Sequence, residues 1–261
     1  LDWRLFLIVV ASTLTIASGY IINNFYDAKK DLINRPKKAM IDRLVSQETK
    51  LKVYFTINFI VAFLMFFISW RAMLFFSAYI FLIWFYSHKL KKMFLIGNIT
   101  AAVLAVLPFF GILMYYKNFY EVIFAHATFL FLLILIRELI KDLENIEGDL
   151  IADYKTIPVV FGEKRAKSII SILTLLTLIP VYFLVEIYNV GYMDIYFYLS
   201  LIALLFFCMM LWKATTKTEY LKLHFLLKFI IVSGVFFFVL IEPSVLFHGK
   251  KLILTHSISI Y

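Results

Sequence analysis

The sequence predicts an all-α protein that crosses a membrane as a bundle of about eight helices. Of its 261 residues, 63% are hydrophobic and only 16% are charged, and the mean hydropathy is +0.91. Apolar runs of about 20 residues, the length that crosses roughly 30 Å of hydrocarbon as a helix, recur along the whole chain. Soluble globular domains do not have this composition, so the lipid bilayer is the predicted solvent.

Eight apolar runs can be placed in order along the chain. They cover residues 3–26, 51–70, 72–88, 95–116, 119–140, 166–188, 193–212 and 220–242. No connection is long enough to hold a soluble domain, so a single membrane domain is predicted over residues 1–261. The one cysteine, Cys208, lies inside an apolar run, which excludes a disulfide framework and a cysteine-based metal site.

The charged residues predict which side each connection faces. The net charge is +9, and the basic residues lie in short connections, where they act as topology signals rather than as a nucleic-acid surface. The connections after the first, third, fifth and seventh spans hold most of them: Lys29, Lys30, Arg35, Lys37, Lys38, Arg43, Lys50, Lys89, Lys91, Lys92, Lys141, Lys155, Lys164, Arg165, Lys213 and Lys217. These connections are therefore predicted to face the cytoplasm, in a bacterial or archaeal cell membrane, with both ends of this chain outside.

Two series of acidic and amide residues leave spans on this same side. After the first span, Asn23, Asp27 and Asp31 recur at steps of four and therefore share one face of a helix. After the fifth span, Asn145 and Asp149 repeat the step of four. Asp142 and Glu138 continue this second series nearby. We expect the two series to converge on one cavity, with their Asp clusters no more than about 15 Å apart.

Paired clusters of oxygen ligands indicate a site for Mg²⁺ and phosphate. Mg²⁺ prefers carboxylates completed by water and by phosphate oxygens, and a substrate would supply the phosphates. The alternative is that both series are ordinary charged loops at helix ends. Matching spacing on the same side, about 120 residues apart, favours the site, as does the cost of placing carboxylates near membrane depth.

With these residues in view, the chain resembles the UbiA superfamily of intramembrane prenyltransferases. The first series resembles the motif NDxxDxxxD, and the second resembles DxxxD. In order along the chain, residues 33–46 then resemble the loop INKPxRxxxxGRxxS of this superfamily. Residues 86–91 resemble its YSxxLK motif, and Gly97 with Asn98 resembles its GN motif. Residues 155–158 resemble its TLP motif, and residues 161–166 resemble its FGxxxA motif. The resemblance covers nearly the whole chain and implies a helical bundle around a central cavity, which holds a polyprenyl diphosphate and Mg²⁺.

Three positions depart from the pattern of this superfamily. Asn24 and Asn145 stand where an Asp is usual, and Asp42 stands where the loop has Gly. The two Asn residues lower the negative charge of the metal site by two, although an Asn carbonyl can still be a ligand. Altered or impaired activity is therefore one possible outcome.

The resemblance also implies a role for each polar residue. Mg²⁺ held by Asn23, Asp27, Asp31, Asn145 and Asp149 would neutralise the leaving diphosphate, with Asp142 assisting, so the carboxylates Asp27, Asp31, Asp142 and Asp149 are the candidate catalytic residues. The candidate diphosphate ligands are Lys38, Arg43, Lys91, Arg137, Lys141 and Lys155. For each of these six, the alternative is a topology charge only. Candidate aromatic neighbours of an allylic cation are Phe25, Tyr26, Tyr86 and Tyr154.

The acceptor of the prenyl group has more than one candidate. The form Arg-Glu-x-x-Lys-Asp at 137–142 resembles the branch that uses geranylgeranylglyceryl phosphate. A quinone precursor or another aromatic acceptor is the alternative within the superfamily. A transporter is the alternative outside it, because Asn98, Thr100 and Lys228 lie in or near spans, but the two halves of the chain show no repeat beyond the acidic series.

The number of spans differs from that of the superfamily by one. The superfamily has nine helices, and its first acidic motif follows the second, whereas here the first motif follows the first span. The chain begins with Leu1 rather than Met. We therefore expect the natural protein to have one more helix before Leu1, with an eight-helix variant as the alternative.

Overall fold

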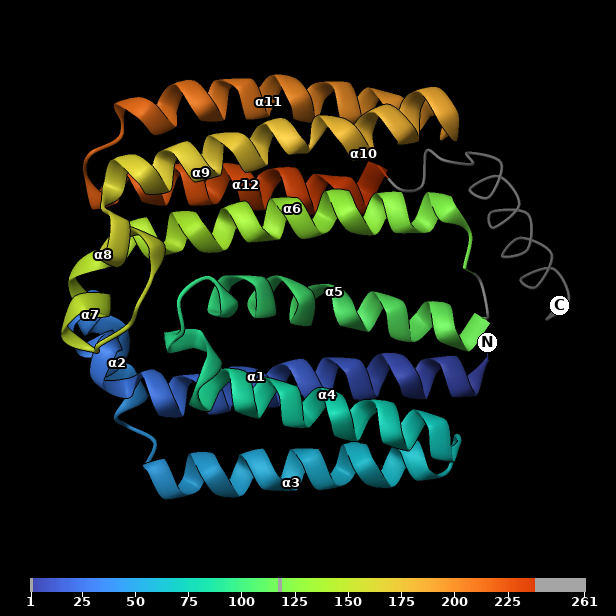
Figure 1. Cartoon of the computed structure of the whole chain (residues 1–261). Helices are drawn as coiled ribbons and strands as arrows, with labels where there is room; N and C mark the ends of the chain where they lie inside the picture. Colours follow the sequence, from blue (N-terminus) through green and yellow to red (C-terminus); the bar gives the residue numbers. More distant parts are fainter. Residues whose placement is uncertain (1, 117–118, 238–261) are drawn as a thin grey trace, which may run out of the picture. The chain divides into compact units, whose positions relative to one another are not determined.

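The computed structural model describes residues 2–116 and 119–237, and every regular element in these residues is helical (Figure 1). The predicted all-α fold is thereby confirmed. The chain forms two compact units: the first is Leu1–Phe119 with Glu138–Ser168, and the second is Tyr120–Arg137 with Ile169–Tyr261. The prediction of a single domain concerns the whole chain and stays a prediction.

The first unit contains the helices that carry both acidic series. Its elements are α1 (Trp3–Asn34), α2 (Pro36–Asp42), α3 (Gln47–Phe66), α4 (Trp70–His88), η1 (Leu90–Lys92), α5 (Ile96–Tyr116), the end of α6 (Glu121–Glu144), α7 (Ile146–Ile151), α8 (Ile157–Phe161) and the start of α9 (Glu163–Leu176). In Figure 1, α1, α3 and α4 lie side by side, with their axes roughly parallel or antiparallel. A core around Ile8, Ala11, Val61, Met65 and Phe76 joins these three helices.

α1 is longer than the first predicted span. The apolar run ends near residue 26, but the helix continues to Asn34, because the polar residues that follow are spaced for one helical face rather than for a loop. Pro36 then stops α1 and starts α2 at a position where a missing N–H does no harm. The first acidic series is therefore held on a rigid helix of 32 residues.

A hydrogen bond between helices stabilises α5 at its proline. Pro108 lies inside α5 and has no N–H, so the carbonyl of Leu104, four residues earlier, lacks its helical partner. The hydroxyl of Tyr79 on α4 donates to this carbonyl over 3.0 Å. The hydroxyl thus replaces the missing backbone donor within an apolar environment, where an orphan carbonyl is costly.

Tyr79→Phe should therefore lower the thermal stability of the protein in detergent. The expected loss is about 1–2 kcal/mol, because the Leu104 carbonyl is left without a donor. In a Pro108→Ala background, the new backbone N–H can bond to Leu104, so the same substitution should have a much smaller effect. Equal losses in the two backgrounds, measured by thermal unfolding, would contradict this account of the bond.

The second unit consists of the remaining apolar helices. Its elements are the start of α6, most of α9, α10 (Leu178–Tyr182), the π-helical turn η2 (Phe183–Ile187), η3 (Gly191–Met193), α11 (Asp194–Lys213) and α12 (Lys217–Phe237). The Tyr196 hydroxyl of α11 donates to the Ile230 carbonyl of α12 over 2.9 Å. Tyr196 also packs on Gly234, where a side chain would overlap its ring. The part of the last predicted span beyond residue 237 lies outside the described residues.

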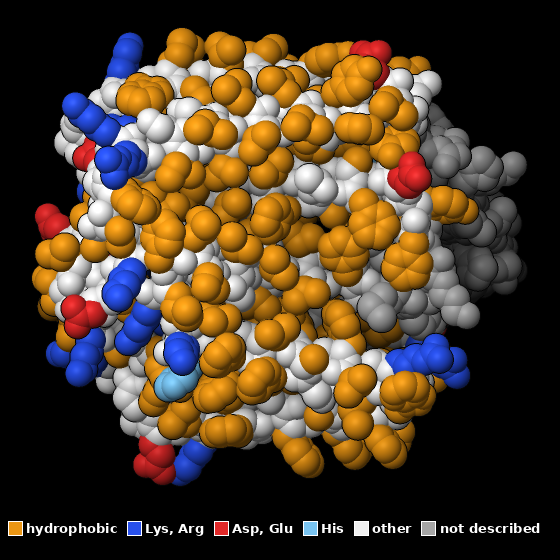
Figure 2. Space-filling model, viewed as in Figure 1, with side chains coloured by type: hydrophobic (Ala, Val, Ile, Leu, Met, Phe, Trp, Pro, Cys, Tyr) orange, Lys and Arg blue, Asp and Glu red, His pale blue; other side chains and the backbone are white. Residues whose placement is uncertain are grey.

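The helices are suited to a bilayer in length and in surface. Within residues 2–116 and 119–237, seven helical stretches are long and apolar enough to span a membrane, and the apolar helix Ile96–Gly111 is an eighth, shorter stretch. Figure 2 shows hydrophobic side chains over the middle of the α3 and α4 region, with Lys and Arg side chains gathered toward the end where α2 and α7 lie. The eight stretches agree with the predicted spans, and the chain is an integral membrane protein.

Candidate active site

The first acidic series lies near the C-terminal end of α1, and other elements of the first unit reach it. The ammonium of Lys91, in η1, donates to Asp27 Oδ1 over 2.6 Å and to Asn23 Oδ1 over 3.2 Å. The hydroxyl of Tyr154, in the connection between α7 and α8, donates to the same oxygen of Asp27 over 2.9 Å. Asp31, one turn further along α1, accepts from Lys38 of α2 over 2.8 Å.

The second series lies where α6 gives way to α7. Asn145 interrupts the helix between the two elements, and its side-chain amide donates to the Lys141 carbonyl over 2.6 Å. Asp149, on α7, is completely buried and pairs with Lys30 of α1. α7 approaches α1 closely at Gly148, where any Cβ atom would collide with the side chain of Asn34.

Both series line one polar cavity of the first unit. A cavity of about 270 Å³ is lined by Asn23, Asp27 and Asp31 from the first series and by Asn145 from the second. A smaller one of about 50 Å³ shares Asn23 and Asp27 with it and adds Asp142. The two series therefore meet at these cavities through Asn145 and Asp142, whereas Asp149 lines neither cavity.

Lysines pair with most carboxylates at the site, including Asp149, which lines neither of the two cavities. Lys91 pairs with Asp27, Lys30 with Asp149, Lys38 with Asp31, and Lys141 with Glu138. Asp142 is the exception, because it accepts from the Asn98 amide over 2.7 Å. The site is therefore a network of opposite charges, in which an anionic ligand can replace the carboxylates as partner of the ammonium groups.

Burial shifts the pKa of the groups outside the spans. Burial lowers the pKa of the Lys91 ammonium, and the adjacent Asp27 opposes this shift. Burial raises the pKa of the Asp149 carboxyl, opposed by Lys30. The pKa of the Tyr154 hydroxyl is raised by burial and by Asp27, so this hydroxyl stays a hydrogen-bond donor at neutral pH.

The oxygen atoms of the second series are suited to a cation whose remaining ligands are phosphate oxygens and water. Among the described residues, no three His, Cys, Asp or Glu side chains form a metal cluster. However, the buried Oδ1 of Asn145 has no hydrogen-bond partner among these residues, and the Asp149 carboxylate has no partner other than Lys30. Mg²⁺ is usually held by one or two carboxylates together with phosphate oxygens and water, so this incomplete ligand set suits Mg²⁺ bound with a diphosphate.

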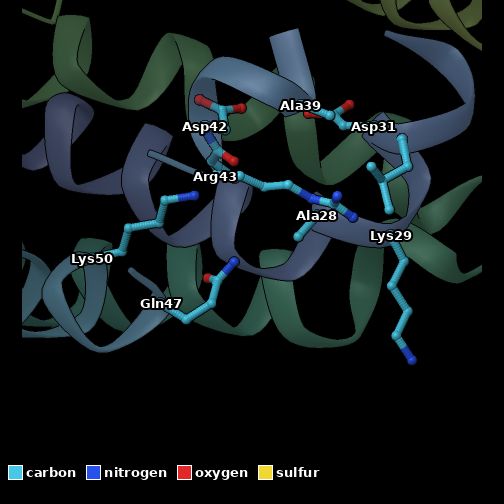
Figure 3. A pocket seen from close by; sticks show the side chains of 10 residues that line it. Ala28, Lys29, Asp31, Ala39, Asp42, Arg43, Gln47 and Lys50 are labelled. Carbon is cyan, nitrogen blue, oxygen red and sulfur yellow. The ribbon is translucent and has the colours of Figure 1, made fainter. Parts of the chain in front are cut away.

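The six predicted diphosphate ligands fall into three groups. Lys38, Lys91 and Lys141 line the two cavities. Arg43 lines a separate cavity of about 220 Å³ between α1, α2 and α3 (Figure 3), and the exposed Lys155 lines neither cavity of the site. Arg137 belongs to the second unit, so its predicted role stays a prediction.

Lys30 lines the candidate site, but the sequence reasoning did not include it among the site residues. It was counted only as a topology charge, but its side chain lines both cavities and pairs with Asp149. The signal was present, because Lys30 follows Asn23 by seven residues and Asp27 by three, and so lies on the same face of α1. The smaller cavity is also lined by Tyr86, Gly97, Asn98, Glu138, Tyr154 and Thr156.

Relatives of the chain were found by sequence and by fold. The digeranylgeranylglyceryl phosphate synthase of Pyrococcus furiosus is 33% identical over 181 residues, which are 69% of this chain and 65% of the relative. Among solved structures, a digeranylgeranylglyceryl phosphate synthase has a TM-score of 0.70 and 23% identity, covering 92% of this chain and 87% of that chain. A UbiA homologue from Archaeoglobus fulgidus bound to GPP and Mg²⁺ has a TM-score of 0.69 and 16% identity, covering 91% and 88%.

The family itself is shown by a match over most of the sequence. The model of the UbiA prenyltransferase family matches residues 1–243. The predicted resemblance and the predicted transferase class are both confirmed at the level of the family. With both acidic motifs lining one cavity and the family match covering nearly the whole sequence, this chain belongs to the UbiA prenyltransferase family.

Proposed function

We propose that the protein transfers a geranylgeranyl group from its diphosphate to geranylgeranylglyceryl phosphate and releases diphosphate in a Mg²⁺-dependent reaction. The observation that carries the proposal is the convergence of the two acidic motifs on one cavity that Lys30, Lys38 and Lys141 also line. The choice of acceptor is supported by the P. furiosus relative, whose name is that of a digeranylgeranylglyceryl phosphate synthase. The chain spans 65% of that relative's length, so its activity is an inference from the family and the site.

The lysines of the cavity would bind the diphosphate. Each has a carboxylate partner in the structure, and phosphate oxygens can take over that position without leaving a charge unpaired. Lys91 is the most buried of these lysines, so its bond to a phosphate would be screened least by water. Tyr154 keeps Asp27 oriented toward the cavity through its hydroxyl.

The carboxylates and amides would hold the metal. Asp27, Asp31 and Asp149, with Asn23 and Asn145, supply the hard oxygen atoms, and Asp142 assists. Mg²⁺, when bound there, supplies a positive charge that stabilises the leaving diphosphate. Asn145 contributes a neutral oxygen in place of a carboxylate, which weakens the site without removing a ligand.

In the transfer itself, the bond between the allylic carbon and the diphosphate oxygen breaks, and the diphosphate leaves with the electron pair. The acceptor hydroxyl oxygen forms the new bond to this carbon and gives up its proton. The cavity wall at Tyr86 and Tyr154 presents aromatic rings, which suit a carbon that carries positive charge. The basic connections around the site support an orientation in which it faces the cytoplasm.

The test is the dependence of turnover on the metal. With the purified protein, labelled geranylgeranyl diphosphate and geranylgeranylglyceryl phosphate, we expect a diether lipid product and stoichiometric diphosphate only when Mg²⁺ is present. EDTA should abolish both, and excess Mg²⁺ should restore them, because the carboxylates alone do not neutralise the leaving group. Mass spectrometry identifies the product.

Parallel reactions with other acceptors separate the proposal from its alternatives. Hydroxybenzoate and a dihydroxynaphthoate should give no product. Prenylation of either in preference to the glyceryl lipid would contradict the proposed acceptor, and Mg²⁺-independent or absent diphosphate release would contradict the enzyme mechanism.

A further inference from the structure

The separate cavity that contains Arg43 has a charge pattern unlike that of the active site. It lies between the C-terminal part of α1, the helix α2 and the first turn of α3, and it has a volume of about 220 Å³. Figure 3 shows the side chains of Arg43, Gln47 and Lys50 gathered at this cavity, while the ammonium of Lys29 lies away from them. These three side chains together offer ten N–H bonds and two positive charges.

Lys50 and Arg43 have no counter-ion among the residues that the structure describes. Only 9% of the surface of Lys50 is exposed, and neither its ammonium nor the Arg43 guanidinium forms an ion pair or hydrogen bond with another described side chain. Of the two acids that line the cavity, Asp31 pairs with Lys38 at 2.8 Å. Asp42 lies 3.9 Å from the same ammonium, and its buried Oδ2 accepts no hydrogen bond from another described side chain. A buried ammonium without a partner is costly, so this cavity is suited to an anionic ligand.

This cavity adjoins the active site but has its own cations. Asn24 and Asp31 line both this cavity and the larger one of the active site. Arg43 and Lys50 line only this cavity, whereas Lys30 and Lys141 line only the active site. Two anionic groups that react next to each other repel, so each needs cations of its own to be held in place.

An apolar groove begins within one turn of Lys50 on the same helix. Leu51, Tyr54 and Phe55 of α3 line this groove together with residues of α1 and α4, and its volume is about 680 Å³. Phe55 lies five residues after Lys50, which is about 7 Å along the helix axis. One amphipathic molecule can therefore place an anionic head against Lys50 and its hydrocarbon chain in the groove.

We propose that Arg43, Gln47 and Lys50 bind the phosphate group of the lipid acceptor, separately from the diphosphate of the prenyl donor, and that the adjacent groove holds the acceptor's hydrocarbon chain. This assignment rests on the proposed function, because it takes the acceptor to be a phosphorylated lipid. It gives the two substrates neighbouring sites that share Asn24 and Asp31 as lining residues.

The first experiment compares substrate dependence in variants of α3. In Lys50→Gln, the KM for geranylgeranylglyceryl phosphate should rise about 10- to 100-fold, the loss typical of one buried charged hydrogen bond, while the KM for geranylgeranyl diphosphate should change less than about twofold. Lys52→Gln is the matched control, because Lys52 is exposed on the same helix and pairs with Glu48. A rise in the donor KM of Lys50→Gln as large as the rise in the acceptor KM would overturn the proposal.

The second experiment does not need turnover and so separates this proposal from the proposed function. Geranylgeranylglyceryl phosphate should raise the unfolding temperature of the wild-type protein more than its dephosphorylated analogue does, and this difference should disappear in Lys50→Gln and Arg43→Gln but not in Lys52→Gln. If the wild-type protein does not distinguish the two lipids, or if the variants still do, the site assignment is wrong whatever the enzyme makes.

A change of the surrounding lipid distinguishes the phosphate group of the acceptor from the phosphate group of a membrane lipid as the ligand of this cavity. The experiment is repeated in vesicles of phosphatidylcholine and in vesicles rich in phosphatidylglycerol. Acceptor stabilisation that persists in both supports an acceptor site, because a phosphomonoester binds more tightly than a phosphodiester head group. Stabilisation that phosphatidylglycerol abolishes would overturn the acceptor assignment and make the cavity a site for membrane lipid.

Discussion

Asp149→Asn is expected to lower kcat by about 10²- to 10³-fold, the loss typical of removing one group that stabilises charge in the transition state. Asp149 is completely buried, and among the described residues its carboxylate has no partner other than Lys30, so we expect its charge to be available to a cation held with the diphosphate. Asn has almost the same shape, which keeps α7 in place while it removes the charge. The measurement is single-turnover kinetics at saturating concentrations of both substrates.

The control for this variant lies four residues further along the chain. Asp153 is exposed, has a φ of 56°, and can be replaced by Asn, which also tolerates this backbone conformation. Asp153→Asn should retain near-normal turnover. A second measurement keeps the result interpretable: Mg²⁺ with diphosphate should raise the unfolding temperature of the wild-type protein and not that of Asp149→Asn. Near-normal turnover in Asp149→Asn would show that the metal assignment is wrong.

Lys91→Met should reduce kcat/KM for the prenyl diphosphate by a comparable factor, about 10²-fold or more. Lys91 is buried in η1 and joins Asn23 to Asp27, so it is placed to exchange these partners for phosphate oxygens. Met keeps the apolar stem and removes the charge. The loss of kcat/KM should therefore be seen for the prenyl diphosphate, and the KM for the acceptor should remain within about twofold of the wild-type value.

Lys89→Met is the matched control for Lys91→Met. Lys89 lies two residues earlier in the same connection and is exposed, so its replacement should leave both KM values unchanged. The Tyr154 hydroxyl still donates to Asp27 in the Lys91 variant, which limits the loss of structure at that carboxylate. If Lys91→Met weakened the binding of both substrates equally, or the binding of neither, Lys91 would not be a diphosphate ligand.

The all-α membrane fold and the two acidic motifs were determined by the sequence alone. The eight spans follow from runs of apolar residues, because the bilayer requires helices of a fixed length, and this requirement does not depend on tertiary contacts. The shared face of Asn23 and Asp27 follows from local helical geometry in the same way. The end of α1 was placed too early, because the polar continuation to Asn34 carries no hydropathy signal.

Which lysine partners which carboxylate was decided only by the tertiary structure. Lys30 and Asp149 are 119 positions apart in the sequence, and they meet because α7 packs on α1 at Gly148, a contact that no local pattern encodes. Arg43 likewise lines a different cavity from the active-site lysines, although the sequence places it among equivalent basic residues. A side chain's type and spacing are local properties, whereas its counter-ion depends on which helices touch, and this contact is fixed by packing over the whole unit.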